Sequence, residues 1–515
     1  MAILSLDPTL TAAVVASCTV YLVLYRLQTL KLHPNEPPIV PSRLPYVGHL
    51  LGMVLEGGRY VKSIGYTTRR AKLLRHRQPI FTLPVPGSRI YVVTDPALAV
   101  AVQRASKTLS FTPLVPDLTK RVIGLDAHTV ALLRENIDPE PGEPHGFLAD
   151  MHNMVYEYLG PGEQLNALSV GAANELGRQV AAYAAQLQQQ PTTVDLLAWV
   201  QHFVTLATAQ FLYGTENPLA RYPELEQAFW DFDHGLGRLL IGVVPYIIAR
   251  APYRGREALV GAFKEYLSAG QHETVGAAPI VQRRVEIARQ HGFTLEATAR
   301  SELSFLFAGI VNTATTTFWT VLQIFARPEL LATVRAEVKA AVVVETDSVR
   351  RLNMELLKNG CPVLHAVFRE CLRMGSDNYS TRLVKTDTVL AGQWHLKAGS
   401  VVQIAGGVIH SDENIWGANT DVFDPARFQR LGEEAKVHPA AFRAFGGGKT
   451  LCPGRHFATS EILFFTALIV LTFDLKGIVV PVKEDRVLPV HVLEPRSRVS
   501  ARVQVKDARP IQATM

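Results

Sequence analysis

The sequence predicts a mainly helical protein with a small β portion, an α+β fold. Apolar residues recur at about 3.6-residue spacing through much of the region 146–374, which is typical of packed helices. Residues 80–83 and 88–93 have strand character on either side of the turn at 85–87. After Arg382 the chain changes to short extended pieces separated by glycine turns. These patterns together favour one large helical body that carries a minor sheet.

The composition indicates a globular protein that can enclose a cofactor. The chain has 515 residues, 48% hydrophobic and 19% charged, without a long charge block that would indicate disorder. Its net charge of +6 suits an acidic protein partner or an anionic membrane face, but it is too diffuse for a nucleic-acid-binding surface. The four cysteines lack the spacing of a disulfide framework or a zinc site, which favours a reducing compartment.

The first 32 residues are predicted to form a membrane anchor. An apolar run at 10–25 precedes Arg26 and Lys31, and with its apolar flanks it approaches the ~20 residues of a bilayer span, although Asp7 weakens its start. A cleaved signal peptide is the alternative, but no basic residues precede the run and no small-residue cleavage site follows it. The basic residues on the C-terminal side place the remainder in the cytosol.

A proline-rich segment follows the anchor. Five prolines between residues 33 and 45 prevent a helix and favour an extended path, so this segment is predicted to be a hinge. No second linker follows, and residues 46–515 are expected to form one catalytic domain.

The most informative motif is the loop at 445–454, which places Cys452 after three consecutive glycines and before an apolar segment at 455–473. Glycines permit turns that a side chain would forbid. A cysteine at the start of a helix meets unpaired N–H groups and a partial positive charge, and both favour a thiolate that can bind iron. A glycine turn with a structural cysteine is the alternative interpretation.

This loop resembles the haem-binding signature of the cytochrome P450 family. Phe445, Gly448, Cys452 and Gly454 match the pattern, while Thr450 stands where the family usually has a basic residue that contacts a haem propionate. The resemblance implies the cytochrome P450 fold and haem b, with Cys452 as the iron ligand. It also implies that Phe445, Gly454 and Lys449, the neighbour that compensates for Thr450, contact the cofactor.

Three further residues resemble the structural charge triad of the same family. Glu370 and Arg373 stand three residues apart on a predicted helix, a spacing that by itself usually marks a surface pair. The sequence Pro425-Ala426-Arg427-Phe428 supplies the family's Pro-x-Arg-Phe element, so Glu370, Arg373 and Arg427 are expected to form a buried triad with an architectural role.

Arg382 lies between these elements and matches the position from which family members send an arginine to a haem propionate. An ordinary arginine at a strand edge is the alternative. The Trp-x-x-x-Arg pair that many family members use for the same purpose is missing, because residues 147–165 contain neither tryptophan nor arginine. The histidines His145, His152 and His456 are expected to be structural or surface groups.

The predicted helix at 303–325 departs from the family's oxygen-activation segment. Ala308 and Gly309 are small, which lets the helix pass close to haem, but Val311 stands where the family has an acid and Asn312 where it has the first threonine. Proton delivery is therefore assigned to Asn312 and Thr313, with ordered water or the substrate as further donors. An asparagine here resembles the sterol 7α-hydroxylase and prostacyclin synthase branches, one of which hydroxylates while the other isomerises a peroxide.

The resemblance implies a haem-thiolate monooxygenase anchored in the endoplasmic reticulum membrane with a cytosolic catalytic domain. The expected substrate is a hydrophobic terpenoid, steroid or similar secondary metabolite. Electrons are expected from NADPH through a separate cytochrome P450 reductase, with cytochrome b5 as a second candidate donor, because no flavin or nucleotide-binding motif is visible. The alternatives are a reductase-independent isomerase or dehydratase of the same fold, and a haem-binding protein without catalysis.

Overall fold

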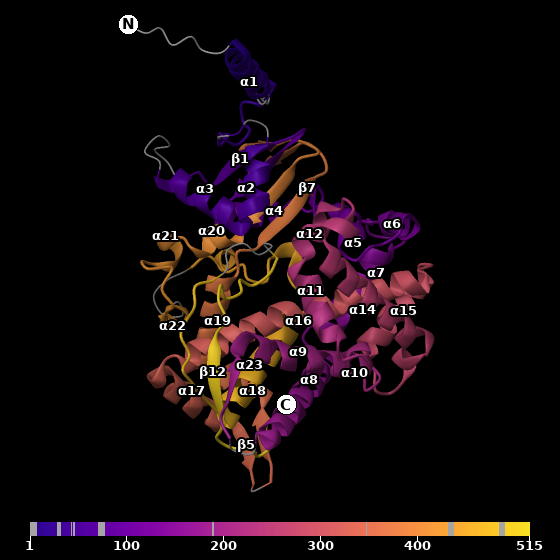
Figure 1. The fold of residues 1–515 in the computed structure, drawn as a ribbon, viewed down its shortest axis with the longest axis vertical. Coiled ribbons are helices and arrows are strands. Elements are labelled where there is room, and N and C mark those ends of the chain that lie inside the picture. Colours follow the sequence, from indigo (N-terminus) through magenta and orange to yellow (C-terminus); the bar gives the residue numbers. More distant parts are fainter. Residues whose placement is uncertain are drawn as a thin grey trace.

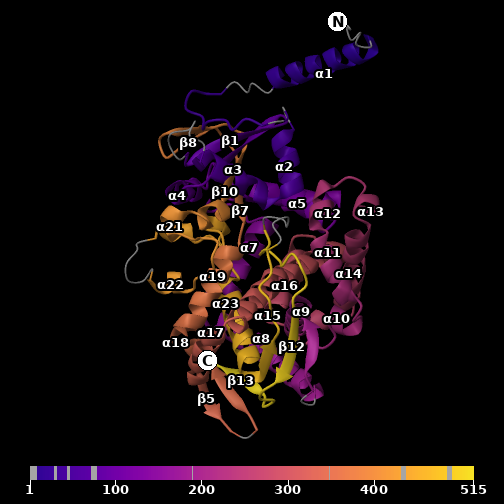
Figure 2. The same cartoon turned by 60° about the vertical axis from the view of Figure 1, so that its left-hand side comes forward.

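The computed structural model describes residues 8–27, 32–42, 44, 47–70, 78–187, 190–346, 348–430, 437–483 and 490–515. It confirms the prediction of a mainly helical α+β protein (Figure 1). Helix α1 (Pro8–Leu27) lies apart from the other elements at the N-terminal end of the molecule (Figures 1 and 2).

Four long helices form the centre of the helical region. They are α8 (Glu163–Gln186), α9 (Leu196–Tyr213), α16 (Leu295–Phe325) and α23 (Arg455–Thr472). Helix α16 packs against both α9 and α23, and α8 packs against the same two helices (Figure 2). The apolar residues that these helices share form the largest core cluster of the chain.

Helix α16 is longer than the sequence predicts, because it begins at Leu295 rather than at residue 303. Its start is fixed by Thr294, whose side chain accepts a hydrogen bond from the Ala297 N–H at 3.1 Å. Polar residues dominate this first part, and they pack against neighbouring helices instead of showing an apolar period.

A five-stranded sheet of order β1-β2-β10-β7-β3 lies at the N-terminal end of the body. Its strands are β1 (Ile80–Val85), β2 (Ser88–Val93), β10 (Val401–Ala405), β7 (Tyr379–Val384) and β3 (Leu109–Ser110). Strand β1 extends two residues beyond the predicted 80–83, because Pro84 and Val85 continue its antiparallel register with β2. Strand β7 is important for the site, because it carries Arg382 into the interior.

The remaining strands form three small sheets. Their orders are β11-β12-β4, β13-β6-β5 and β8-β9. The bounds are β4 (Thr192–Asp195), β5 (Val342–Glu345), β6 (Arg350–Asn353), β8 (Thr388–Leu390), β9 (Trp394–Leu396), β11 (Phe473–Lys476), β12 (Ser500–Val505) and β13 (Ile511–Thr514).

Other helices surround these elements. Before α9 they are α2 (Gly48–Glu56), α3 (Gly58–Arg70), α4 (Pro96–Arg104), α5 (Val115–Val122), α6 (Ala127–Arg134) and α7 (Phe147–Leu159). After α9 come α10 (Pro218–Arg221), α11 (Leu225–His234), α12 (Leu236–Ile241), α13 (Pro245–Ile248), α14 (Arg250–Ser268) and α15 (Pro279–Gln290). The rest are α17 (Pro328–Ala340), α18 (Met354–Gly360), α19 (Pro362–Gly375), α20 (Gly406–His410), α21 (Glu413–Trp416) and α22 (Ala426–Arg430).

The described part of the proline-rich segment runs along β1. The Thr82 N–H donates to the Pro38 carbonyl at 2.8 Å, and the Val40 N–H donates to the Thr82 carbonyl at 2.9 Å. Glu36 is buried beneath the sheet, where Arg89 and Tyr91 donate to its carboxylate at 2.6 and 2.9 Å. Of the predicted hinge at 33–45, residues 43 and 45 lie outside the described ranges, as do residues 1–7 and 28–31 of the predicted anchor.

Within the described part of the chain, α16 and α23 are long and apolar enough to cross a membrane. Both are mostly buried inside the protein, as expected for core helices. Their apolar character therefore reflects the interior of the body.

Candidate functional site

The cysteine loop contacts β7 and α4 and leads into α23. Gly446 and Gly448 have positive φ angles of 76° and 63°, which explains glycine at both positions. A side chain at Gly447 would clash with the side-chain amide of Gln103 on α4. The loop closes through the Cys452 N–H, which donates to the Phe445 carbonyl at 2.9 Å.

Cys452 lies half-buried immediately before α23. Burial raises the pKa of its thiol, while the N–H groups of Gly454 and Arg455 and the charge of Arg455 lower it. The sequence predicted that the helix start would favour the thiolate, but in this structure desolvation outweighs that contribution. Direct coordination to a cation would keep the sulfur deprotonated.

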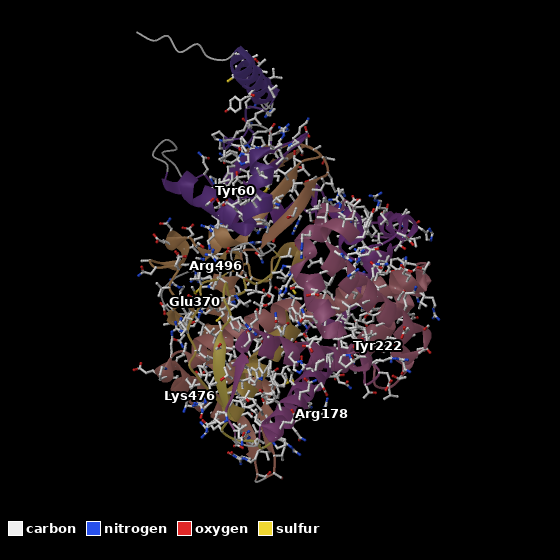
Figure 3. The ribbon with its side chains drawn as sticks, in the orientation of Figure 1. Tyr60, Arg178, Tyr222, Glu370, Lys476 and Arg496 are labelled. Atoms are coloured by element: carbon white, nitrogen blue, oxygen red, sulfur yellow. The ribbon has the colours of Figure 1, made fainter. Side chains whose placement is uncertain are left out.

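Glu370 on α19, labelled in Figure 3, is fully buried. Two arginines lie beside it. Arg373 donates to both carboxylate oxygens, with Nε–Oε2 and Nη2–Oε1 distances of 2.8 Å, and Arg427 on α22 lies 3.6 Å from Oε1. Arg373 also donates to the carbonyl oxygens of His410 and Thr420, both at 2.7 Å. The structure thus brings the three predicted residues together and ties α19 to the segment that leads into α22.

Arg382 on β7 is also buried, at 4% exposure. Its guanidinium donates to the Thr381 carbonyl at 2.7 Å and to the Thr450 hydroxyl in the cysteine loop. Burial lowers the pKa of Arg382 to about 10. Lys449 is exposed instead, and its charge reaches His152 on α7, where burial first and this charge second lower the imidazole pKa.

The predicted oxygen-activation segment lies in the middle of α16. Ala308 and Asn312, four residues apart and therefore on one helix face, are exposed although most of this helix is buried. Gly309 faces α9, because a Cβ there would lie 3.4 Å from the methyl group of Thr208. Thr313 is buried at 5% exposure.

Asn312 makes contacts that the sequence did not predict. Its Nδ2 donates to the Val490 carbonyl at 3.3 Å, and its Oδ1 accepts from the Val492 N–H at 2.8 Å. Between these two contacts, His491 pairs with Asp233 on α11 at 2.9 Å. The asparagine therefore joins α16 to the segment at 490–492, and an amide retains one further donor hydrogen and one further acceptor site.

Two other site residues were missed by sequence reasoning. Tyr156 on α7 donates to the Leu451 carbonyl at 2.7 Å and so braces the residue before Cys452. Glu461 on α23 is buried at 3% exposure with only the Thr208 hydroxyl, 3.4 Å away, as its hydrogen-bond partner among the described residues. Burial raises the pKa of Glu461 to about 8. No pattern distinguishes either residue, since each stands on an ordinary helix face.

The three histidines considered in the sequence occupy peripheral positions. His145 pairs with Asp150 at 3.0 Å, and the His152 ring lies 4.6 Å from that of Tyr156. Burial and the nearby charges of Arg455 and Lys358 lower the pKa of His456. Among the described residues, the cluster with metal-ligand geometry is Asp233, His234 and Glu494, which contains neither these histidines nor Cys452.

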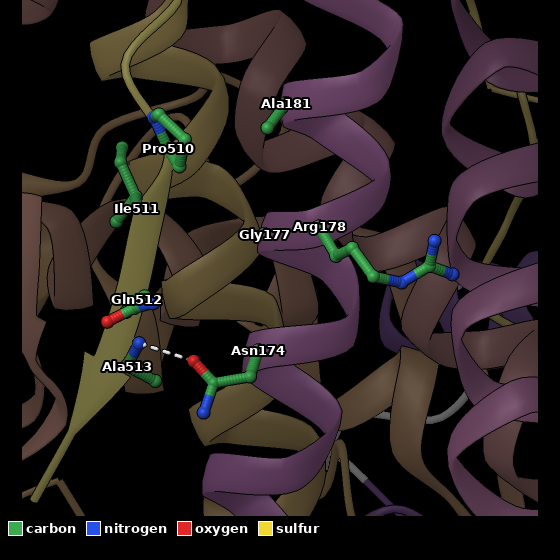
Figure 4. Close-up of a pocket in the computed structure, with 8 residues that line it drawn as sticks. All are labelled: Asn174, Gly177, Arg178, Ala181, Pro510, Ile511, Gln512 and Ala513. Atoms are coloured by element: carbon green, nitrogen blue, oxygen red, sulfur yellow. Dashed lines mark hydrogen bonds between the residues drawn. The ribbon is translucent and has the colours of Figure 1, made fainter. Parts of the chain in front are cut away.

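A separate surface hollow of about 470 Å³ lies between α8 and β13. Figure 4 shows that it is lined by the helix face around Asn174 and Arg178 and by residues 510–513. The Asn174 side chain accepts from the Ala513 N–H at 2.8 Å, so this region holds the C-terminal strand in place. It contains none of the predicted site residues.

Comparisons with known proteins point to one family. The model of the family described as cytochrome P450 matches residues 259–496. Cytochrome P450 monooxygenase nodJ of Hypoxylon pulicicidum is 31% identical over 459 residues, which cover 87% of this chain and 84% of that protein. Cholesterol 7-alpha-monooxygenase of Cricetulus griseus is 26% identical over 278 residues, about half of each chain.

The fold is shared with a solved structure. Retinoic-acid-bound cyanobacterial CYP120A1 superposes with a TM-score of 0.68 at 19% identity, covering 91% of this chain and 99% of the other.

Proposed function

Because the chain belongs to the cytochrome P450 family and is a P450 monooxygenase with a haem cofactor held by a cysteine thiolate, we propose that Cys452 supplies that thiolate. We further propose that the enzyme inserts one oxygen atom from dioxygen into a hydrophobic terpenoid, steroid or similar secondary metabolite. Electrons come from NADPH through a separate reductase.

The environment of Cys452 carries this proposal. Cys361 and Cys371 are buried, and burial raises the pKa of both thiols to about 12, while Cys18 lies on α1. Cys452 is the half-buried cysteine, and it alone follows a glycine loop and precedes a core helix. Haem, when bound there, supplies the activation of dioxygen.

The residues on α16 define the distal side of the proposed site. The small side chain of Ala308, on the same exposed helix face as Asn312, leaves room for a flat cofactor and for dioxygen. Asn312 offers an amide donor on the exposed helix face, and Thr313 offers the next hydroxyl. Val311 has no exchangeable proton, so we assign proton delivery to Asn312 and Thr313 with water.

The electron donor is proposed to dock beside the cysteine loop. Lys449 and Lys358 are exposed, and Arg455 is half-buried at the start of α23. The charges of Arg455 and Lys358 both lower the pKa of His456, so both lie near this histidine. A basic surface suits an acidic flavoprotein such as NADPH-cytochrome P450 reductase, or cytochrome b5.

The proposed substrate class follows from an apolar distal side and from one relative. Phe305 and Phe307 are half-buried near Ala308 on α16. The relative named cholesterol 7-alpha-monooxygenase acts on a polycyclic lipid by its name, which supports a substrate of similar size and hydrophobicity. Such a ligand would be held mainly by apolar contact.

A membrane location is proposed from exposed apolar side chains. On α1, the described large apolar residues Val15, Val20, Tyr21, Leu22 and Val23 are 47–60% exposed. Further exposed apolar groups lie on α2 and around α12 and α13: Leu50, Leu51, Val54, Leu55, Ile241, Val243, Tyr246, Ile247 and Ile248. Exposed apolar area of this kind suits insertion in a bilayer, and we place the enzyme in the endoplasmic reticulum with residues 1–32 as the anchor and 46–515 in the cytosol.

A ligand test separates Cys452 from the other cysteines. The reduced protein with carbon monoxide is expected to show the red-shifted Soret band of a thiolate-carbonyl adduct. Cys452→Ala should abolish this band, while the matched Cys361→Ala should keep it. A band that survives in Cys452→Ala would overturn the assignment of the ligand.

A second test addresses the reaction. Metabolites that accumulate when the gene is deleted are offered to purified protein with and without NADPH and the reductase. Oxygenated product that depends on the reductase supports the proposed reaction, whereas turnover without NADPH would indicate rearrangement or dehydration of an oxygenated substrate.

A further inference from the structure

The buried arginines of this protein fall into two groups. Among the residues that the structure describes, eight arginines have exposures of 8% or less: Arg256, Arg284, Arg300, Arg350, Arg373, Arg382, Arg427 and Arg443. Six of them lie within 4 Å of a carboxylate: Arg256, Arg284, Arg300, Arg350, Arg373 and Arg427. A buried guanidinium without such a partner is costly, so pairing is the expected arrangement.

Arg382 and Arg443 are the exceptions within the described ranges. Arg443 is 1% exposed, its Nε has no partner there, and its Nη2 donates to the Ser380 hydroxyl at 3.3 Å. The amide oxygen of Gln103, in the orientation that satisfies both groups, accepts from Nη1 and Nη2 at 3.1 Å. Among the described residues, Arg382 likewise has only a carbonyl and a hydroxyl as partners. All these partners are neutral.

The two guanidiniums also belong to one site. Burial first and the charge of Arg382 second lower the pKa of Arg443 to about 10. Ser380, which accepts from Arg443, stands two residues before Arg382 on β7, so the two side chains share one face of the strand. Arg443 stands two residues before Phe445, the start of the cysteine loop, and Arg382 donates to Thr450 within that loop. Two like charges are thus near each other in the interior, beside the cysteine loop.

We propose that Arg443, oriented by Gln103 and Ser380, binds a haem carboxylate together with Arg382 and replaces the basic residue that is missing at Thr450. The inference rests on the proposed function, since it takes Cys452 as the haem ligand. Haem b carries two carboxylates, which match two unpaired guanidiniums in number and in charge. Arg443, which leads into the loop, supplies the positive charge that the loop lacks at Thr450.

If the proposal is right, replacing Arg443 should have opposite effects on the stability of the haem-free protein and on haem binding in the haem-bound protein. Removing an unpaired buried charge should leave the haem-free protein at least as stable, whereas removing a paired one should destabilise it. The haem-bound form, in contrast, should lose a charge-assisted contact to the cofactor.

The test compares Arg443→Met and Arg443→Gln with the matched control Arg350→Met, whose arginine pairs with Asp507 at 3.3 Å. Haem transfer from the holoenzyme to apomyoglobin should be about tenfold to a hundredfold faster in both Arg443 variants and unchanged in the control. The unfolding midpoint of haem-free protein should fall in the control only. Arg443→Lys should slow haem loss again, because it restores the charge.

A modified cofactor identifies the group that Arg443 contacts. Wild-type protein should retain iron protoporphyrin IX dimethyl ester, whose carboxylates are blocked, at least tenfold less well than haem. The Arg443 variants should discriminate less between the two cofactors. Undiminished discrimination in these variants, or a haem-free midpoint that falls as in the control, would make Arg443 a purely structural residue.

The carbon monoxide spectrum separates this failure from failure of the proposed function. If the Arg443 variants keep the thiolate-carbonyl band and also keep haem as tightly as wild type, Cys452 remains the ligand and only the Arg443 inference is overturned. If wild-type protein itself lacks that band, the assignment of Cys452 is wrong.

Discussion

The surroundings of Glu370 and the middle of α16 hold their polar side chains in different ways. Glu370 accepts two 2.8 Å hydrogen bonds from Arg373, three residues away on the same helix, and Arg427 lies beside it. Asn312 on α16 instead binds backbone groups of Val490 and Val492, nearly 180 residues away, and its side chain remains exposed. The first arrangement is a closed network of charges, and the second is an open contact between two segments.

This difference separates residues that maintain the fold from residues that can be replaced without loss of the fold. A closed buried charge network tolerates little change, because loss of one member leaves another charge unpaired. An exposed amide that joins two segments can be replaced at smaller cost, and its free donor and acceptor remain available to a ligand or to water. We therefore expect mutations near Glu370 to act on stability and mutations near Asn312 to act on chemistry.

The largest expected effect is that of Glu370→Gln. The neutral amide cannot compensate two buried guanidiniums, so the free energy of unfolding should fall by about 3–5 kcal/mol and little haem-bound protein should accumulate. Denaturant unfolding and the haem content of the purified protein measure this. Glu345→Gln, which removes an exposed partner of Arg509, is the control and should change stability by about 1 kcal/mol or less. Equal effects of the two variants would contradict the role of a closed network.

The next effect is on turnover. Asn312→Leu removes both hydrogen bonds to the segment at 490–492 and the free amide groups, so product formation should fall at least about tenfold while more reducing equivalents go to hydrogen peroxide. Thr317→Val is the control, because the Thr317 hydroxyl is buried and donates to the Thr313 carbonyl at 2.9 Å. The ratio of product to NADPH consumed gives the result. An unchanged ratio in Asn312→Leu would exclude the residue from proton delivery.

These two regions also differ in how much the sequence could predict. Glu370 and Arg373 stand three residues apart on a helix, so local geometry brings them together once the helix forms. The contacts of Asn312 with Val490 and Val492 depend on how the chain returns to α16 after α23, which no local pattern encodes. The contact between Tyr156 and Leu451 has the same origin, with 295 residues between the partners.

The cysteine loop combines features that the local sequence predicts with features that depend on distant parts of the chain. The glycines and Cys452 are apparent from spacing, because the turns require positive φ angles that favour glycine. The direction of the thiol pKa shift was not apparent, since it depends on burial by elements distant in sequence. The start of α16 was missed for a related reason, because its first residues, among them Arg300 and Glu302, are buried in polar contacts.

A third prediction concerns a buried carboxylate without a charged partner. Burial raises the pKa of Glu461 to about 8, well above the usual value of 4.5. Between these two pH values the unfolded chain is ionised at this residue while the folded chain stays protonated, so the contribution of Glu461 to stability falls as pH rises from 4.5 to about 8. The slope has an upper limit of about 1.4 kcal/mol per pH unit.

Glu461→Gln should remove this dependence, so the variant should gain stability relative to wild type at pH 8 compared with pH 5. Unfolding midpoints in denaturant at the two pH values measure the difference. A Glu461→Gln curve parallel to that of wild type would contradict protonation of this residue in the folded state.

The smallest expected effect is on reductase docking. Lys449→Glu reverses a charge on the exposed side of the cysteine loop, and the apparent KM for reductase should rise by about two- to fivefold at low salt, with kcat at saturating reductase nearly unchanged. The control is Lys476→Glu, labelled in Figure 3, which makes the same change in net charge at the opposite end of α23, about 27 Å along an 18-residue helix. Because exposed charges are screened, the effect of Lys449→Glu should shrink as ionic strength rises, while that of Lys476→Glu should be small throughout. Equal effects of both variants would mean that net charge, rather than the surface beside Cys452, determines docking, and the basic surface would then have no specific role.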